Sequence, residues 1–363
     1  MWFALLTVLW ALALAGLFYM TVRFHSFGFI RRLVEKSRLL SWCAAFGLLS
    51  PLALFLLFNI YTLVIVLLHL VIFTALVQLA ARALRALRKR PVSPNAVNIT
   101  ALCLTAVYVG CGFFAAFHVF ETDYSFKTDK NIGGSLRIVE IADLHVGITQ
   151  TGESFARQIQ RVNALDPDAV MIVGDFVDDD SSKEDMLRAC EALGEVKSTY
   201  GVYFVLGNHD DGYFNYREFS GSELRRQLAA HNVVVLEDEA VLVDGRFYVV
   251  GRLDKSMLNR KSAAEITAGL DESIYTVILD HQPNDYANEA ETCADLVLSG
   301  HTHGGHIFPA GYIGLWTGAN DRVYGTENRN GVDFVVTSGI SGWALPIKTG
   351  TFSEIVVIDV TQI

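Results

Sequence analysis

Five separated segments of this sequence bring Asp, Asn and His side chains together in short groups. The groups are Asp143 and His145; Asp175; Asn208, His209 and Asp210; His281; and His301 and His303. Oxygen and imidazole ligands suit Mn²⁺, Fe²⁺ or Zn²⁺ better than thiophilic ions. Without His209 and Asp210 the groups offer seven ligands, more than one ion takes, so two divalent ions sharing a bridging carboxylate fit them best. Such a pair polarises a phosphoryl group and generates a hydroxide for in-line attack, which points to hydrolysis of phosphate esters.

Each polar group follows a short apolar run, as in "DAVMIVGD", "GVYFVLGNHD" and "ADLVLSGHTHGG". The first runs alternate with helical patterns near 153–164, 182–197 and 220–231, which predicts a largely parallel sheet covered by helices. Hairpin-like strands are expected at 332–338 and 353–360. Ligands of open α/β sheets bind beyond the carboxyl ends of the strands. Any one group is equally consistent with a polar turn at a strand end, but five such groups favour a common site.

The motifs resemble, in order, the signature of calcineurin-like metallophosphoesterases, and their context resembles the membrane-associated bacterial branch of that family. The matching blocks are Asp143-Leu-His145, Gly174-Asp175-Phe-Val-Asp178, Gly207-Asn208-His209-Asp210, His281 and Gly300-His301-Thr-His303. Five ordered blocks make the resemblance specific, and it covers roughly residues 136–363. It implies an αββα sandwich and a metal-dependent phosphoesterase that acts on mono- or diesters.

The resemblance also implies a role for each matching residue. The first metal ion would be held by Asp143, His145 and His303, the second by Asn208, His281 and His301, and Asp175 would bridge the two. The non-ligand His209 would stabilise phosphoryl charge or protonate the leaving group, and Asp210 would orient it. Asp178 would lie just outside the ligands. His306 is open between a substrate contact and a surface loop residue.

The first 120 residues differ sharply in composition from the rest. They contain ten Lys and Arg and one acid, Glu35, a net charge of +9, whereas residues 121–363 hold 19 basic and 38 acidic residues, a net charge of −19. A domain this acidic repels phosphate backbones, so nucleic acid is not the expected partner. Four apolar segments without Asp, Glu, Lys or Arg, at 2–22, 39–59, 61–81 and 98–120, predict a transmembrane region. Residues 121–135 are expected as a linker to the domain at 136–363.

The distribution of basic residues predicts the orientation of these spans. All ten lie in or beside two stretches, 23–38 and 82–90, and the positive-inside rule places both basic loops in the cytoplasm. The catalytic domain is then extracytoplasmic, near envelope or lipid-linked phosphoesters. Aromatic residues after the Asn-His-Asp block (Tyr213, Phe214, Tyr216 and Phe219) would grip a lipid or membrane, or else pack under a mobile loop.

Two other functions compete with a membrane-anchored phosphoesterase. One is a pyrophosphatase of nucleotide-linked lipids, of the UDP-diacylglucosamine type, whose cytoplasmic substrates disagree with the expected topology. The other is a catalytically silent membrane sensor or scaffold, which a missing metal ligand would support. No ligand is missing from the motifs, so hydrolysis is the leading hypothesis.

Overall fold

The computed structural model describes residues 2–214 and 216–363, and the chain divides into two compact units, Met1–Gly112 and Phe113–Ile363. The first unit is helical. Its elements are α1 (Trp2–His25), α2 (Gly28–Leu33), α3 (Arg38–Gly47), the 3₁₀ helix η1 (Ser50–Leu57), α4 (Ile60–Arg88) and most of α5 (Pro94–Phe117). Four segments are long and apolar enough to cross a membrane: Thr7–His25, Arg38–Leu57, Ile60–Arg88 and Pro94–Phe117.

Two details of these segments differ from the expectation. The second is broken: α3 ends at Gly47, and η1 begins at Ser50, directly before Pro51, which lacks an amide hydrogen and cannot continue an α-helix's hydrogen bonds. The third extends beyond residue 81 to Arg88. Residues 82–88 are Ala, Leu and Arg, which favour helix, so Arg82 and Arg85 lie on a helix rather than in a loop.

The second unit contains two six-stranded sheets. One has the order β1 (Val119–Thr128), β12 (Ser353–Gln362), β2 (Ser135–Ile141), β3 (Ala169–Val173), β4 (Val202–Val205) and β5 (Val233–Val235). The other has the order β10 (Gly325–Arg329), β11 (Val332–Val336), β9 (Leu296–Ser299), β8 (Tyr275–Leu279), β7 (Phe247–Gly251) and β6 (Glu239–Val243). Strands β2 to β5 are mutually parallel, as are β7, β8, β9 and β11.

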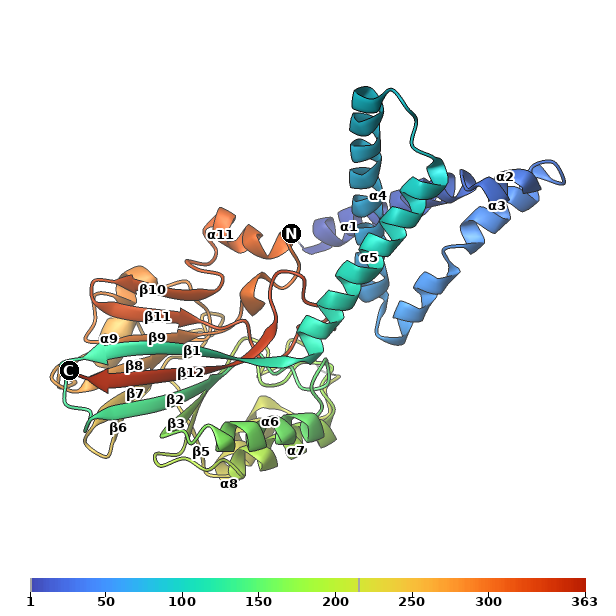
Figure 1. The fold of residues 1–363 in the computed structure, drawn as a ribbon. Helices are drawn as coiled ribbons and strands as arrows, with labels where there is room; N and C mark the ends of the chain where they lie inside the picture. The colour runs from blue at the N-terminus through green and yellow to red at the C-terminus, as the bar shows by residue number, and fades with distance from the viewer. Residues whose placement is uncertain (1, 215) are drawn as a thin grey trace. The chain divides into compact units, whose positions relative to one another are not determined.

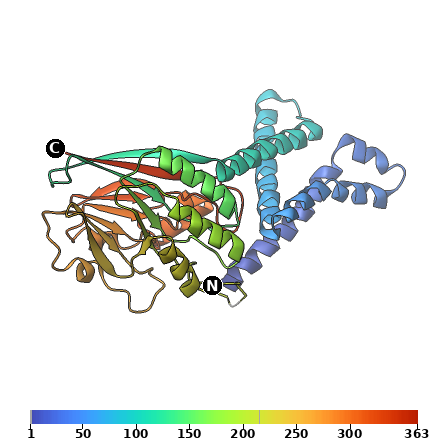
Figure 2. The same cartoon turned by 90° about the horizontal axis from the view of Figure 1, so that it is seen from below.

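Three apolar layers hold the second unit together. Helices α6 (Gly152–Ala164), α7 (Lys183–Gly194) and α8 (Gly221–Ala230) cover the outer face of the first sheet (Figures 1 and 2). The two sheets pack face to face through a second core that includes Ile138, Met171, Val249 and Leu298. Short helices α9 (Ala263–Thr267) and α10 (Tyr286–Glu289) pack on the second sheet. This layering confirms the expected α/β sandwich.

Two parts of this sandwich differ from the sequence-based expectations. Most of the expected linker, 121–135, belongs to β1, which pairs in parallel with β12 over ten residues. Two alternate side chains of β1, Tyr124 and Phe126, pack against the core between the sheets. The segment therefore has the alternation of inward and outward side chains that is typical of a strand, although most of its residues are polar. The strands expected at 332–338 and 353–360 do not pair with each other, because β11 and β12 lie in different sheets.

Candidate metal centre

The predicted site residues lie at the carboxyl ends of parallel strands from both sheets. Asp143 and His145 follow β2, Asp175 follows β3, and Asn208 follows β4 in the first sheet. His281 follows β8, and His301 and His303 follow β9 in the second sheet, where His303 begins the 3₁₀ helix η2 (His303–Gly305). The edge that the two sheets share therefore carries ligand-type side chains from five strands.

The backbone at this edge is unusual for residues other than glycine. Five of the seven predicted ligands have positive φ: Asp143 (54°), His145 (37°), Asp175 (50°), His301 (67°) and His303 (48°). Non-glycine residues in this region cost about 1 kcal/mol or more each and gather at functional sites. Gly174 provides the space, because a Cβ atom there would lie 2.5 Å from Nδ1 of His281.

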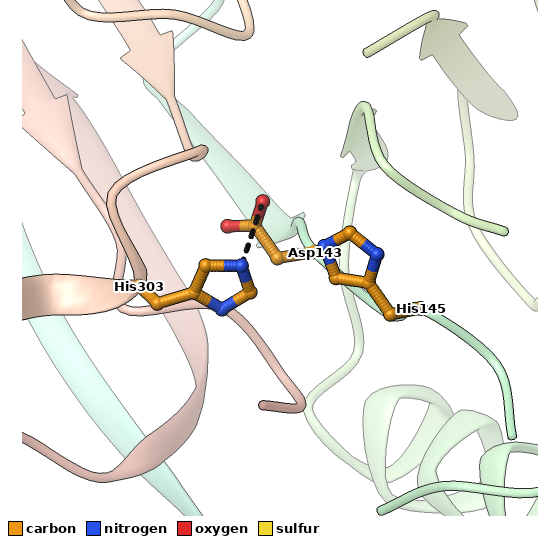
Figure 3. Close-up of side chains that lie close together, drawn as sticks. All are labelled: Asp143, His145 and His303. Atoms are coloured by element: carbon orange, nitrogen blue, oxygen red, sulfur yellow. Dashed lines mark ion pairs between the residues drawn. The ribbon is translucent and has the colours of Figure 1, made fainter. Parts of the chain in front are cut away.

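Three groups of three residues present their ligand atoms within 4.8 Å of one another. Two of them consist of predicted metal ligands: the first is Asp143, His145 and His303, and the second is Asp175, His281 and His301. The remaining group, His145, Asp178 and His209, contains only one predicted ligand. Figure 3 shows the first group, in which Nε2 of His303 lies 3.9 Å from Oδ1 of Asp143. Oδ2 of Asp175 lies 3.6 Å from Nε2 of His145 and 3.1 Å from Nε2 of His281. Asp175 therefore touches both groups, as a bridging ligand must.

The hydrogen bonds of the imidazoles fit metal binding. Nδ1–H of His281 donates to the carbonyl of Val173 at 2.8 Å, and Nδ1–H of His303 donates to the carbonyl of Ser341 at 3.2 Å. Each donation fixes the tautomer and leaves the Nε2 lone pair for an ion. Nε2 of His281 and of His145 are buried and have no hydrogen-bond partner among the described residues. A divalent ion would satisfy these atoms.

The electrostatics of the centre reflect its burial. Burial opposes ionisation of Asp175, but the neighbouring histidines, His281 above all, outweigh it and hold the pKa of Asp175 well below its usual range. Burial lowers the pKa of His301 to about 4 and that of His303 well below its usual range. Neutral imidazoles are the form that binds metals.

His209 lies beside the two groups, and its carboxylate partner differs from the expectation. Nδ1 of His209 lies 3.4 Å from Oδ1 of Asp178, whose Oδ2 lies 3.2 Å from Nδ1 of His145. Burial lowers the pKa of His209, but Asp178 and Asp175 outweigh it and raise the value. The carboxylate beside Nδ1 of His209 is therefore that of Asp178, whereas the resemblance implied Asp210.

Asp210 has a different task. Its buried Oδ1 accepts hydrogen bonds from the amides of Phe176 (2.9 Å) and Val177 (3.1 Å), and Oδ2 accepts one from Gly207 (2.7 Å). These bonds fasten the turn that follows Asp175 to the turn that precedes Asn208. Asp210 thus holds two loops that carry predicted ligands together.

Asn208 and His306 complete the predicted residues. Nδ2 of Asn208 donates to the Tyr213 hydroxyl at 3.0 Å, and Oδ1 lies 3.4 Å from Nε2 of Gln282. The half-buried ring of His306 lies 5.4 Å from that of His303, and burial together with Lys348 lowers its pKa to about 3. His306 belongs to neither ligand group and lies behind His303.

Sequence reasoning missed three residues at this edge. Asp254 is fully buried, and both its oxygens accept from Nε2 of Gln282 at 2.9 Å. The ring of Trp343 lies 5.6 Å from that of His209. Asp254 follows β7, a sixth strand whose carboxyl end is followed by a potential ligand, and Gln282 directly follows His281. The expectation that polar residues after strand ends share one site would therefore have identified Asp254 and Gln282 as well.

The arrangement agrees with the comparisons to known proteins. Residues 136–305 match the family model described as calcineurin-like phosphoesterase. An uncharacterised metallophosphoesterase of Campylobacter jejuni is 31% identical over 235 residues, which cover 63% of this chain and 60% of that protein. A transmembrane protein with a metallophosphoesterase domain from Danio rerio is 30% identical over 251 residues, which cover 65% of this chain and 55% of that protein.

A third relative matches over most of its own length. An uncharacterised metallophosphoesterase of Aquifex aeolicus is 29% identical over 246 residues, which cover 65% of this chain and 90% of that protein. By contrast, the chain spans about three fifths of the Campylobacter relative and of a putative metallophosphoesterase of Caenorhabditis elegans.

Proposed function

Because residues 136–305 carry a calcineurin-like phosphoesterase domain, we propose that this chain is a membrane-anchored phosphohydrolase with two divalent metal ions that cleaves phosphate mono- or diesters. One observation carries the proposal most strongly. The Asp175 carboxylate lies between two ligand groups, 3.6 Å from His145 and 3.1 Å from His281. A buried carboxylate beside imidazoles whose ring nitrogens, such as Nε2 of His145 and of His281, have no hydrogen-bond partner among the described residues is suited to bridge two cations.

We assign the ligands as the two groups suggest. Asp143, His145 and His303 hold one ion, His281 and His301 hold the other together with Asn208, and Asp175 bridges them. The chemistry that two such ions supply when bound is polarisation of the phosphoryl oxygens and activation of a water molecule for in-line attack. The ion types that suit these ligands are Mn²⁺, Fe²⁺ and Zn²⁺.

The protein itself contributes a proton donor and a fixed geometry. Asp178 orients His209 through Nδ1, which leaves Nε2 to donate to the phosphoryl group or to the leaving-group oxygen. Asp210 and Gly174 keep the ligand loops in register. Tyr213 and Trp343, whose rings flank His209 at 5.1 and 5.6 Å, exclude water from one side of the substrate.

The location of the substrate follows from the anchor. Four candidate spans precede the domain, and their basic residues, at 23–38 and 82–90, favour a cytoplasmic position for both stretches. The domain then lies outside the cytoplasm, and its substrates are envelope or lipid-linked phosphoesters. A nucleotide-linked lipid pyrophosphatase would need the opposite orientation. A silent sensor or scaffold would not need a complete set of buried ligands.

Hydrolysis by the full-length protein tests this proposal. The chain, purified in detergent and loaded with Mn²⁺, is expected to hydrolyse aryl phosphate mono- or diesters, and Asp175→Asn is expected to abolish turnover. Asp244→Asn is the matched control, because Asp244 is exposed in the turn between β6 and β7. Absence of turnover with Mn²⁺, Fe²⁺ and Zn²⁺ alike would refute the enzymatic function.

A further inference from the structure

The end of α5 is bonded to the sheet edge that carries the metal centre. Phe113–Phe117, the last residues of α5, belong to the C-terminal unit. Oγ of Ser353 donates to the carbonyl of Ala116 at 2.8 Å, and the amide of Glu354 donates to the carbonyl of Gly339 at 3.0 Å. A Cβ atom on Gly339 would lie 2.6 Å from that of Asp143. Direct contacts thus connect the end of the fourth candidate span with a predicted metal ligand.

Strand directions lead to the same conclusion. Strands β1 and β12 are parallel, and both begin beside α5, whereas the C-terminus lies at the opposite end of β12 (Figure 1). Strand β2 is antiparallel to β12 and therefore ends, at Ile141, where β12 begins. His118 alone separates α5 from β1. The metal-bearing edge of the second unit is therefore the edge at which its first residues, the end of α5, are attached.

An apolar loop projects from this edge. Residues 307–318 contain no Asp, Glu, Lys, Arg or His, although the domain as a whole is strongly charged. Phe308, Ile313 and Trp316 are 56%, 52% and 69% exposed. These three residues lie on the loop that includes η3 (Ala310–Tyr312) and α11 (Ile313–Thr317). Several large apolar side chains that are exposed on the same loop indicate an interaction surface.

The apolar loop is fastened to the segment that leads into β12. The carbonyl of His306 accepts from the amides of Thr349 (2.8 Å) and Gly350 (2.9 Å), and the amide of Phe308 donates to Oγ1 of Thr349 at 3.1 Å. Phe352, three residues later, touches the ring of Phe120 at 5.0 Å. The loop therefore shares its support with the end of α5.

A second exposed aromatic group borders the centre at His209. Tyr213, Phe214 and Tyr216 are 57%, 63% and 61% exposed, whereas Phe219 is buried. The aromatics expected after the Asn-His-Asp block thus divide into one core residue and three surface residues. Tyr213 faces His209, so this group also borders the candidate site.

We propose that the apolar loop 307–318 enters the interfacial layer of the bilayer that holds the candidate spans, and presents the metal centre to phosphoesters at the depth of the lipid headgroups. Trp, Tyr and Phe favour this layer, and apolar area gains free energy by entering it. Because the loop has no charged side chain, its insertion does not incur the cost of desolvating a charge. The lipid substrate rests on the proposed function, whereas the membrane contact does not.

A fluorescence experiment tests the membrane contact without using catalysis. In a cysteine-free full-length chain reconstituted in phosphatidylcholine nanodiscs, Trp316→Cys carries an environment-sensitive fluorophore. We expect its emission to fall when lipids with a quencher on the acyl chain replace ordinary lipids. The control is Ile363→Cys, which is 78% exposed at the opposite end of β12 and should keep its emission.

Two results would overturn the contact. One is equal emission from position 316 with and without quencher lipids. The other is a blue-shifted emission that persists in detergent and depends on protein concentration, which would identify a second copy of the chain as the occupant of the loop. In either case the proposed phosphohydrolase activity would be unaffected.

A substrate comparison tests the functional consequence. The triple variant Phe308→Ser, Ile313→Ser and Trp316→Ser should hydrolyse a soluble aryl phosphoester like the wild type. The rate of phosphatidic acid hydrolysis in the nanodisc should fall roughly tenfold. The reason is that a loop that inserts less well brings the site to the lipid substrate less often. An equal loss on both substrates, or no loss on either, contradicts the inference. A wild type inactive on both would contradict the proposed function, while the fluorescence result would stand.

Discussion

The carboxylate of Asp178 lies between two histidines, 3.4 Å from Nδ1 of His209 and 3.2 Å from Nδ1 of His145. Burial would raise the pKa of Asp178, but the neighbouring His145 and His209 outweigh it and lower the pKa below its usual value. One ionised side chain thus orients both a predicted metal ligand and the predicted proton donor. Metal binding by His145 and proton donation by His209 are therefore both expected to depend on Asp178, which was predicted to lie just outside the metal ligands.

Asp178→Asn is expected to lower kcat roughly 10- to 100-fold, the usual cost of losing an orienting partner. An amide has one oxygen acceptor, so it cannot serve both histidines. We also expect a lower melting temperature at neutral pH, because the folded state loses an ionised carboxylate that the two histidines stabilise. Steady-state kinetics and metal content measure the effect. Asp180→Asn, at an exposed carboxylate two residues away, is the control, and equal kcat values for the two variants would contradict the role.

Asp210→Asn is expected to act on stability. The substitution replaces one carboxylate oxygen by an NH₂ group, which cannot accept a hydrogen bond. That group then faces either the backbone amide of Gly207 or those of Phe176 and Val177. At least one buried hydrogen bond is lost, at a cost of about 1–3 kcal/mol in the free energy of unfolding. Thermal unfolding should show a lower melting temperature, by roughly 2–10 °C for a domain of this size. Asp211→Asn, which breaks an exposed ion pair with Arg225, should change it little. Similar shifts in both variants would argue against this task for Asp210.

Most of the site could be predicted because polar residues follow the carboxyl ends of several apolar strands. Parallel strands bring such residues to one edge of a sheet. The number of candidate ligands, seven, predicted two ions, and the structure places His301 and His303 in different ligand groups. What the sequence could not show is which carboxylate reaches which imidazole. Asp178 and Asp210 both lie near His209 along the chain or in space, and only the path of the backbone decides between them.

The fold was predictable to a similar degree and for a similar reason. Helices α6, α7 and α8 have clear amphipathic patterns and lie within a few residues of the expected ranges. Strand β1 was missed because its polar residues resemble a linker, and its stability comes from pairing with β12, more than 200 residues later. Such long-range pairing leaves little local signal. The domain limits at 120 and 136 stay a prediction.

Removal of metal is expected to destabilise the domain. Without cations, the buried carboxylates of Asp143 and Asp175 repel each other, and the backbone strain at the ligands is not offset. An ion at 100 times its Kd stabilises the folded state by about 2.7 kcal/mol, so a chelator should lower the melting temperature by roughly 5–10 °C. Scanning fluorimetry with and without chelator measures this. Asp175→Asn should show a much smaller shift, and an equal shift would contradict metal binding at Asp175.

Glu140→Gln is expected to change the pH dependence of stability. Burial, with Glu354 and Asp143, raises the pKa of Glu140 well above its usual value, and neither carboxylate oxygen has a hydrogen-bond partner among the described residues. Below the unfolded-state pKa, about 4.3, both states are protonated and the shift has no effect. As pH rises above that value, the unfolded state ionises first and the free energy of unfolding falls.

The variant should therefore gain melting temperature relative to the wild type, and the gain should be larger at pH 8 than at pH 5. Thermal unfolding at the two pH values measures it. Glu272→Gln, at an exposed position, is the control and should show the same difference at both. A gain that is equal at pH 5 and pH 8 would mean that the pKa of Glu140 is not raised in the folded state.

The orientation of the chain is the last prediction, and it decides which phosphoesters the site can meet. With the basic stretches 23–38 and 82–90 in the cytoplasm, the domain after Phe117 faces outward. Protease added to intact cells should then remove the C-terminal domain and leave the spans. A variant with fewer basic residues tests whether these charges set the orientation. Replacing Arg31, Arg32, Arg82 and Arg85 by Gln weakens the positive-inside signal. The C-terminal domain should then be protected from the protease in a fraction of the molecules. Full protection of the wild-type domain would place the metal centre in the cytoplasm and restore the nucleotide-linked lipid pyrophosphatase as the leading function.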